Sequence, residues 1–493
     1  MRLTRLVVCF GLLAVSLVSA QWLEETIYLP DSFGGVTSPC CQVWDSANST
    51  VYVGGDNGNC VLAIDEVTNQ RTARVPTGTN GKALCYNPTN NKVYCANGGD
   101  NTVTVIDGAT NMALATVVAG SVPSALCYNS QNNKVYCAND SSDNVTVIDG
   151  ALDSVLATFT TGESPCTFCY NPANNKVYCA NLHGNSVSVI DGATDQIVAT
   201  VTAGDNPRVL CYNPTNNKVY CANEGSDNVT VIDGETDSVL CTVSTSSQPF
   251  ALCHNSRDNK VYSANYDGRS VTVIDGATDS VLCTVPIGDP FALCYNSQNS
   301  KVYCASNCLP GEVTVIDGAS NNVITTYAVG ESPTGLCYDS QYNNVYCANY
   351  QRHRVTVMDG ASNYQATTID VGLGPGAMLS GLTLGRVYVA NCRSSSISVL
   401  RDTTPSAVEM PNAEARTTKC LPTIVRGVLF FPGASNHESQ DASLLDATGR
   451  KVLDLRPGAN DVRALAPGVY FVREEPQASS HKPQAIRKIV LTK

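Results

Sequence analysis

The chain has 493 residues, of which 43% are hydrophobic and 15% are charged, and its formal net charge is −12. So high an apolar content with so little charge excludes a disordered chain. The acidic balance leaves no basic stripe to neutralise phosphates, so a nucleic-acid-binding protein is excluded too.

Residues 1–20 have the pattern of an export signal. Arg2 and Arg5 precede an apolar core, and the segment ends in Val18-Ser19-Ala20, a pattern that signal peptidase cleaves. The core is short for a membrane helix, and no other segment approaches about 18 consecutive apolar residues. We therefore expect an exported protein, secreted or at the cell surface, with no membrane span once residues 1–20 are removed.

Residues 21–402 are a repeat array. A Val-Tyr dipeptide recurs nine times at spacings of 41–43 residues, beginning at Val51-Tyr52 and ending at Val387-Tyr388. Residues 83–97 in one unit predict two strands joined by an Asn-Pro turn, and residues 101–107 and 112–120 predict a third and a fourth strand. A period near 42 with four short strands is typical of a β-propeller blade.

The two ends of the array predict how the ring closes. The ninth unit has three strands and stops at Arg401-Asp402, while an orphan strand at residues 25–30 precedes the first unit. That strand would complete the last blade and remove an exposed sheet edge. The prediction is an all-β propeller of nine blades, with eight as the alternative because propellers usually have about four to eight.

Cysteines recur at two offsets of the repeat, and this pattern has two interpretations. Each could be a small buried strand residue that carries a free thiol. Alternatively, the spacing of ten residues across a hairpin predicts cross-strand disulfides in an oxidising compartment. The candidate pairs are Cys85 with Cys95, Cys127 with Cys137, Cys169 with Cys179, Cys211 with Cys221, Cys294 with Cys304, and Cys337 with Cys347.

The connections between strands differ in how much they vary within the chain. Asn-Pro turns between the first and second strands, and Asp-Gly turns between the third and fourth, repeat almost unchanged, which is typical of scaffold. Loops between the second and third strands differ in every unit, and variable loops on a rigid framework are a usual place for binding. Our candidate binding residues in these loops are His183, Tyr266, Arg269, Tyr350, Arg352, His353 and Arg354.

No catalytic constellation is found in the sequence. The five histidines have no metal-ligand spacing, and there is no G-x-S-x-G elbow or Walker loop. We predict no catalytic residue, no metal site and no cofactor.

The chain changes character after Asp402. Residues 403–420 carry no strand period and are predicted to be a linker. Residues 421–493 contain five short apolar segments separated by turn residues such as Thr448-Gly449 and Pro457-Gly458, so we expect a small C-terminal β-sandwich.

The repeats resemble the YVTN-type surface-layer β-propeller family. The motif NNKVYCANGGDNTVTVIDGATN at residues 90–111 carries the resemblance, with Tyr-Cys-Ala-Asn in place of the family's Tyr-Val-Thr/Ala-Asn. The resemblance implies a propeller fold. It leaves function open, because similar propellers serve as surface proteins, binding platforms, lactonases or cofactor enzymes.

The tail resembles the C-terminal sorting domain that the type IX secretion system recognises. The family's Gly-Arg/Lys-x-Val hairpin, Leu-x-x-Gly-x-Tyr-x-Val strand and basic last strand have counterparts here, while its Tyr-Pro-Asn-Pro opening is absent. The matching residues include Gly449, Arg450, Gly468, Tyr470 and Lys488. The resemblance implies that the tail engages secretion machinery and serves secretion or surface attachment.

Two functions remain open from the sequence. The favoured one is a non-enzymatic binding scaffold for an extracellular protein or glycan. The alternative is a secreted or periplasmic propeller enzyme, lactonase-like or cofactor-dependent.

Overall fold

The structure is a computed structural model that describes residues 20–30, 35–380 and 383–403, together with strands between residues 423 and 491. The chain divides into two compact units, Met1–Pro405 and Ser406–Lys493. The predicted export segment lies outside the described residues except for Ala20, and the predicted linker lies outside them except for Thr403.

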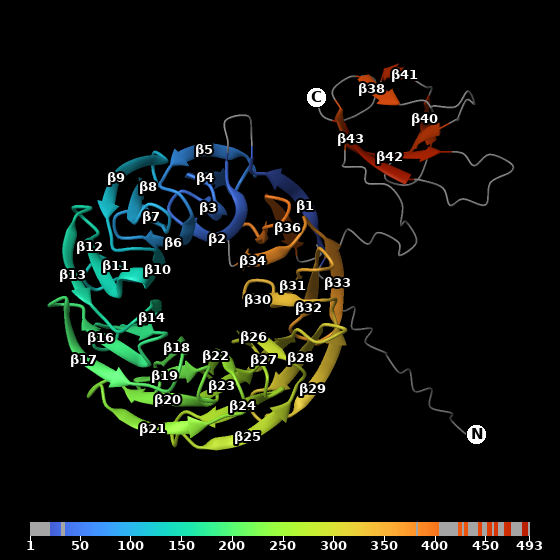
Figure 1. Cartoon of the computed structure of the whole chain (residues 1–493). Coiled ribbons are helices and arrows are strands. Elements are labelled where there is room, and N and C mark those ends of the chain that lie inside the picture. The colour runs from blue at the N-terminus through green and yellow to red at the C-terminus, as the bar shows by residue number, and fades with distance from the viewer. Residues whose placement is uncertain are drawn as a thin grey trace, which may run out of the picture. The chain divides into compact units, whose positions relative to one another are not determined.

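The first unit is a ring of nine four-stranded antiparallel sheets, which confirms the nine-blade prediction over the eight-blade alternative (Figure 1). Strands run outward in chain order, and the first strand of each blade lies nearest the centre of the ring. Blades 1–4 comprise β2 (Thr37–Asp45), β3 (Thr50–Asn57), β4 (Cys60–Asp65) and β5 (Arg71–Pro76); β6 (Gly81–Asn87), β7 (Lys92–Asn97), β8 (Thr102–Asp107) and β9 (Met112–Val118); β10 (Pro123–Asn129), β11 (Lys134–Asn139), β12 (Asn144–Asp149) and β13 (Val155–Thr160); and β14 (Pro165–Asn171), β15 (Lys176–Asn181), β16 (Ser186–Asp191) and β17 (Gln196–Thr202).

The remaining blades repeat this plan. A single turn of 3-10 helix, η1 (Asp140–Ser142), lies in the second-to-third loop of blade 3. Blades 5–9 comprise β18 (Pro207–Asn213), β19 (Lys218–Asn223), β20 (Asn228–Asp233) and β21 (Val239–Ser244); β22 (Pro249–Asn255), β23 (Lys260–Asn265), β24 (Ser270–Asp275) and β25 (Val281–Pro286); β26 (Pro290–Asn296), β27 (Lys301–Ser306), β28 (Glu312–Asp317) and β29 (Val323–Ala328); β30 (Pro333–Asp339), β31 (Asn344–Asn349), β32 (Arg354–Asp359) and β33 (Gln365–Asp370); and β34 (Pro375–Leu379), β35 (Arg386–Asn391), β36 (Ser396–Thr403) and β1 (Ala20–Tyr28).

The predicted closure is confirmed. Strand β1 pairs antiparallel with β36 and forms the outer strand of blade 9, so the two ends of the array meet in one sheet. Arg386 on β35, whose side chain is 6% exposed, forms an ion pair with Glu24 on β1 at 2.6 Å. The ring therefore has no open seam between blade 9 and blade 1.

The core lies between the faces of neighbouring blades. Cys95 packs with Tyr52 and Val61 of blade 1, whereas Cys85 packs with Val135 and Cys137 of blade 3. The two cysteines of one blade thus contribute to two different inter-blade layers, because side chains alternate between the two faces of a sheet.

The strand register contradicts the cross-strand disulfides. Cys85 pairs with Tyr94, and Cys95 pairs with Leu84, so the two sulfurs lie on opposite faces of the same hairpin. The register is the same in the other five candidate pairs, and all twelve cysteines are free thiols in the structure. A shift of one residue is enough to prevent pairing, because it places the side chains on opposite faces.

Every first strand also carries a β-bulge close to where it begins. The pairing between first and second strands shifts right after a proline, or after Gly81 in blade 2. A bulge places two residues opposite one and redirects a side chain. The nine residues that follow the proline or glycine, called here the bulge ring, are Cys40, Lys82, Ser124, Cys166, Arg208, Phe250, Phe291, Thr334 and Gly376.

The described strands of the second unit form two sheets. One has the order β37-β43-β42-β39-β40, and the other pairs β38 with β41. Gly468 and Tyr470 lie on β42 and Lys488 on β43, which are antiparallel partners, while Gly449 and Arg450 lie outside the described residues. The strands are β37 (Thr423–Val425), β38 (Val428–Phe431), β39 (Ala442–Leu445), β40 (Lys451–Leu455), β41 (Gly458–Asp461), β42 (Gly468–Glu474) and β43 (Ile486–Leu491). Among the described residues, no helix has the length and apolar character needed to span a membrane.

Candidate binding site on the loop face of the ring

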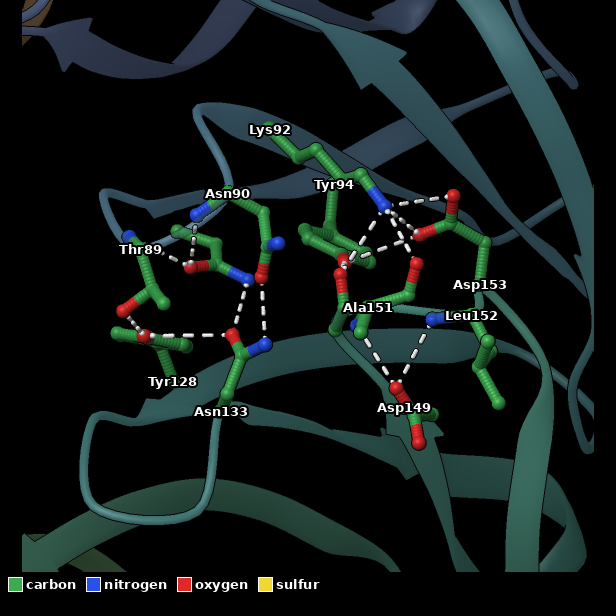
Figure 2. A network of polar contacts seen from close by, with 12 residues as sticks. Thr89, Asn90, Lys92, Tyr94, Tyr128, Asn133, Asp149, Ala151, Leu152 and Asp153 are labelled. Atoms are coloured by element: carbon green, nitrogen blue, oxygen red, sulfur yellow. Dashed lines mark hydrogen bonds and ion pairs between the residues drawn. The ribbon is translucent and has the colours of Figure 1, made fainter.

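The turns between the first and second strands and between the third and fourth strands form one face of the ring, called here the turn face. Figure 2 shows its polar network at the contact between blades 2 and 3. Lys92 on β7 donates to both carboxylate oxygens of Asp153 at 2.8 Å and to the carbonyl of Gly150 at 3.0 Å. The hydroxyl of Tyr94 donates to the same carboxylate. Both charged side chains are largely buried, so this ion pair is shielded from water.

The contact is repeated around the whole ring. Each blade's repeat tyrosine is fully buried, and its hydroxyl donates to a carboxylate or amide oxygen of the next blade. A buried hydrogen bond contributes about 0.5–1.5 kcal/mol when its acceptor is neutral and about 1.5–3 kcal/mol when its acceptor is charged. The nine pairs are Tyr52 with Asn111, Tyr94 with Asp153, Tyr136 with Asp195, Tyr178 with Asp237, Tyr220 with Asp279, Tyr262 with Asn321, Tyr303 with Asn363, Tyr346 with Asp402, and Tyr388 with Asn69.

The Asp-Gly turns are explained by the same scaffold role. The carboxylate of Asp275 accepts hydrogen bonds from the backbone N–H groups of Ala277 and Thr278 at 3.0 and 2.8 Å. The backbone hydrogen bond from Thr278 lowers the pKa of Asp275, which keeps the turn's acceptor ionised at neutral pH. Repetition of these turns thus follows from blade-to-blade contact and turn closure.

The opposite face, called here the loop face, holds the second-to-third loops and the connections between blades. Contacts between these segments place them together. Arg269 in the second-to-third loop of blade 6 forms an ion pair at 2.9 Å with Asp289, which precedes blade 7. Arg352 in blade 8 forms an ion pair with Glu331, which precedes that blade.

The seven predicted binding residues do not form one site. The three cationic or imidazole side chains near blade 8 already have partners on the protein. Arg352 pairs with Glu331, Arg354 pairs with Asp370, and the Nδ1 atom of His353 accepts from the backbone N–H of Gly374. Tyr350 lies beneath Arg393, whose guanidinium carbon is 5.9 Å from its ring centre. His183 is exposed at the tip of its loop.

Tyr266 is the predicted residue that the structure brings into a cluster. Its ring centre lies 6.2 Å from that of Phe250 and 6.3 Å from that of Phe291. The two phenylalanines lie 4.7 Å apart, and the guanidinium carbon of Arg208 lies 4.4 Å above the ring of Phe250. Arg208 also forms an ion pair with Glu224 at 3.2 Å. Three aromatic rings and a cation thus gather on consecutive blades 5–7.

Sequence reasoning missed Phe250 and Phe291 because these residues belong to first strands and not to the variable loops. A signal was present, since the residue at this position of the blade differs from blade to blade while the residue before it is proline in eight blades and Gly81 in the other. In blade 9 this position is open, since a Cβ built on Gly376 meets no atom within 4 Å. The small polar residues of the bulge ring form hydrogen bonds with the next blade. The Thr334 hydroxyl, for example, donates to the Pro375 carbonyl at 3.1 Å.

The histidine, cysteine and acidic side chains of the described blades do not form a metal site. Within the described residues, no group of three or more His, Cys, Asp or Glu side chains is arranged to hold a metal ion. Burial raises the pKa of the repeat thiols, to about 12 for Cys85 and Cys127, so these cysteines are poor nucleophiles.

Comparisons with known proteins agree with the propeller architecture. A family model described as Lactonase, 7-bladed beta-propeller matches residues 192–285, which include blade 5 and nearly all of blade 6. No curated protein matches the chain significantly.

Solved structures match the chain at low sequence identity, and two of them are similar to it in fold. Saccharomyces cerevisiae Sqt1 is 12% identical with a TM-score of 0.54, covering 75% of this chain and all of that one. The dihydro-heme d1 dehydrogenase NirN in complex with DHE is 14% identical with a TM-score of 0.53, covering 70% of this chain and 77% of that one. Kuenenia stuttgartiensis hydrazine synthase is 19% identical with a TM-score of 0.43, covering 67% and 96%. The chain is a β-propeller repeat protein with nine blades.

Proposed function

We propose that this protein is an exported binding scaffold whose loop face binds an extracellular protein or glycan. The observation that carries the proposal is the cluster of Arg208, Phe250, Tyr266 and Phe291 on three adjacent blades. Aromatic residues and arginine dominate the energetics of protein interfaces, and aromatic faces provide large apolar contact at low entropic cost.

The pattern around the bulge ring supports this proposal. Ser124, Cys166 and Thr334 occupy the position equivalent to Phe250 and are satisfied by carbonyl groups of the protein. Phe250 and Phe291 are half-buried, so part of each aromatic ring is exposed at a position where other blades have a small residue. A ring of similar blades therefore presents one sector with a distinct surface.

A binding screen tests the proposal. The chain from residue 21 onward is screened against glycans and extracellular proteins, and the double variant Phe250→Ala/Phe291→Ala is compared with Ser124→Ala. We expect the double variant to lose at least about tenfold in affinity and Ser124→Ala to keep wild-type binding, since a truncated hot-spot residue costs about 2 kcal/mol or more. Unchanged binding by the double variant would contradict a role for this cluster.

We further propose that the tail engages secretion machinery, on the basis of its resemblance to type IX sorting domains. Tyr470 on β42 and Lys488 on β43 lie on neighbouring antiparallel strands of one sheet. Deletion of residues 421–493 is expected to keep the propeller inside the cell envelope, as measured by the distribution of the ring between cell fractions and medium. Export at the wild-type level after this deletion would contradict the role.

A lactonase-like activity is the second candidate, because the lactonase family model matches residues 192–285. That range contains Arg208, Phe250 and Tyr266, so the same sector of the ring would be involved. This activity is tested with a panel of lactones, whose hydrolysis is measured by the acid that it releases. Turnover that the Phe250→Ala/Phe291→Ala variant loses and Ser124→Ala keeps would favour the enzyme over the scaffold.

A further inference from the structure

Two consecutive cysteines converge at the bulge of blade 1. In a regular strand, neighbouring side chains point to opposite faces. Here the pairing shifts from Pro39 with Gly55 to Cys41 with Gly54, which leaves Cys40 as the extra residue of the bulge. As a result, the sulfurs of Cys40 and Cys41 lie 3.4 and 3.6 Å from the same oxygen, the carbonyl of Gly81.

The opposing strand makes room for the second sulfur. In the other eight blades, an alanine occupies the place of Gly54. A Cβ at Gly54 would lie 2.9 Å from the sulfur of Cys41, closer than real Cβ contacts. Gly54 and Cys41 are therefore matched to each other. The eight alanines are Ala96, Ala138, Ala180, Ala222, Ala264, Ala305, Ala348 and Ala390.

Charged groups and solvent lie beside the pair. The sulfur of Cys40 is 3.9 Å from a carboxylate oxygen of Asp56, which forms an ion pair with Lys82 at 2.7 Å. The side chains of Lys82 and Asp56 are 40% and 44% exposed, so water and small solutes reach this edge of the ring. Cys40 and Cys41 are themselves only half-buried, unlike Cys95 behind them.

The two thiols differ in acidity. The hydrogen bond from Cys41 lowers the pKa of Cys40, and the ammonium of Lys82 adds to this effect against burial and Asp56. The same hydrogen bond and burial raise the pKa of Cys41. Burial raises the pKa of the neighbouring Cys95 to about 12. Cys40 is therefore the more reactive member of the pair.

We propose that Cys40 and Cys41 form a thiol–disulfide exchange site that reacts with disulfides of low molecular mass. The Cys40 thiolate attacks one sulfur of the disulfide R–S–S–R, whose S–S bond breaks, and the released RS⁻ takes up a proton. Cys41 then loses its proton to solvent and attacks the Cys40 sulfur, which forms the Cys40–Cys41 bond and releases the second RS⁻. The two protein thiols are oxidised and one small disulfide is reduced to two thiols. This site goes beyond the binding role proposed above.

The test uses the reduced full-length protein and glutathione disulfide as the probe. Alkylation followed by peptide mass analysis first compares the rates of native Cys40 and Cys85, and we expect Cys40 to react at least about tenfold faster. After treatment with glutathione disulfide, the peptide with Cys40 and Cys41 should lose the mass of two hydrogen atoms. The single-cysteine bulge at Cys166 serves as an internal control that forms no such bond.

Variants separate the role of Cys40, which attacks the small disulfide, from that of Cys41, which attacks the Cys40 sulfur. Cys41→Ser should accumulate a mixed disulfide on Cys40, and Cys40→Ser should show neither product. Gly54→Ala should slow closure because its Cβ displaces the Cys41 sulfur, while Gly376→Ala, which meets open space, should not. The proposal fails if Cys40 reacts no faster than Cys85 while the protein is folded, or if both thiols remain alkylatable after treatment with glutathione disulfide.

Discussion

The turn face and the loop face are built from the same nine repeats but differ in what their side chains contact. On the turn face, Lys218 donates to Asp279 at 2.7 Å, and both side chains are about 90% buried. On the loop face, Lys82 donates to Asp56 at the same distance, yet both side chains are 40% or more exposed. The difference shows that repetition follows the contacts between blades and that variation occurs where side chains meet solvent.

The largest expected effect is a loss of stability when the lysine of the buried ion pair is replaced by methionine, compared with the same replacement in the exposed pair. Lys218→Met leaves the buried carboxylate of Asp279 without its cation and should lower the free energy of unfolding by about 3–5 kcal/mol. Lys82→Met should change it by at most about 1 kcal/mol, because exposed pairs contribute little. Denaturant titration measures both. Equal losses would show that burial does not distinguish the faces.

Removal of single hydroxyl groups tests the tyrosine contacts. The Tyr220 hydroxyl donates to the carboxylate of Asp279 at 2.8 Å, so Tyr220→Phe should cost about 1.5–3 kcal/mol. Tyr303 is the matched control, since its partner, Asn363, is neutral and 3.5 Å away, and Tyr303→Phe should cost about 0.5 kcal/mol. A larger loss for Tyr303→Phe in denaturant titration would contradict the assigned contacts.

Acid should weaken the turn face through its capping aspartates. Backbone hydrogen bonds lower the pKa values of Asp233, Asp275 and Asp317 in the folded state. The unfolded chain then binds more protons between the folded pKa and the usual Asp value of about 3.9, so stability falls as pH drops through that range. Thermal melting at a series of pH values should show a shallower acid loss for the Asp233→Asn/Asp275→Asn/Asp317→Asn variant. An unchanged slope would contradict this.

The smallest effect is expected at exposed loop-face pairs. Arg354 and Asp370 are 52% and 81% exposed, and Arg354→Ala should change the free energy of unfolding by less than about 0.5 kcal/mol. The melting temperature measures this change. A loss of stability as large as that of Lys218→Met would mean that ion pairs on the loop face stabilise the ring as much as those on the turn face.

Most of the fold could be predicted from periodicity, but the candidate sites could not. The cysteine spacing of ten residues suggested opposed sulfurs, while the hairpin register pairs Cys85 with Tyr94 and so places Cys95 on the other face. Of the predicted binding residues, Tyr266 lies in the aromatic cluster. Its partners, Phe250 and Phe291, come from the first strands of blades 6 and 7 and not from the loops. Distances between residues about 40 positions apart depend on how the blades pack.

The sequence by itself determined the repeat, the four strands in each blade and the closing strand, because these follow from local period and from one unmatched segment at each end. It predicted nine blades with eight as the alternative, and the sheets of the structure decided for nine. The tertiary structure alone decided which side chains gather. Bulges redirect Cys40, Phe250 and Phe291 away from the regular alternation of their strands, and ring closure brings equivalent positions side by side. A proline recurs before nearly every bulge, but the sequence does not show where the next side chain points, because that direction depends on the register between the two strands.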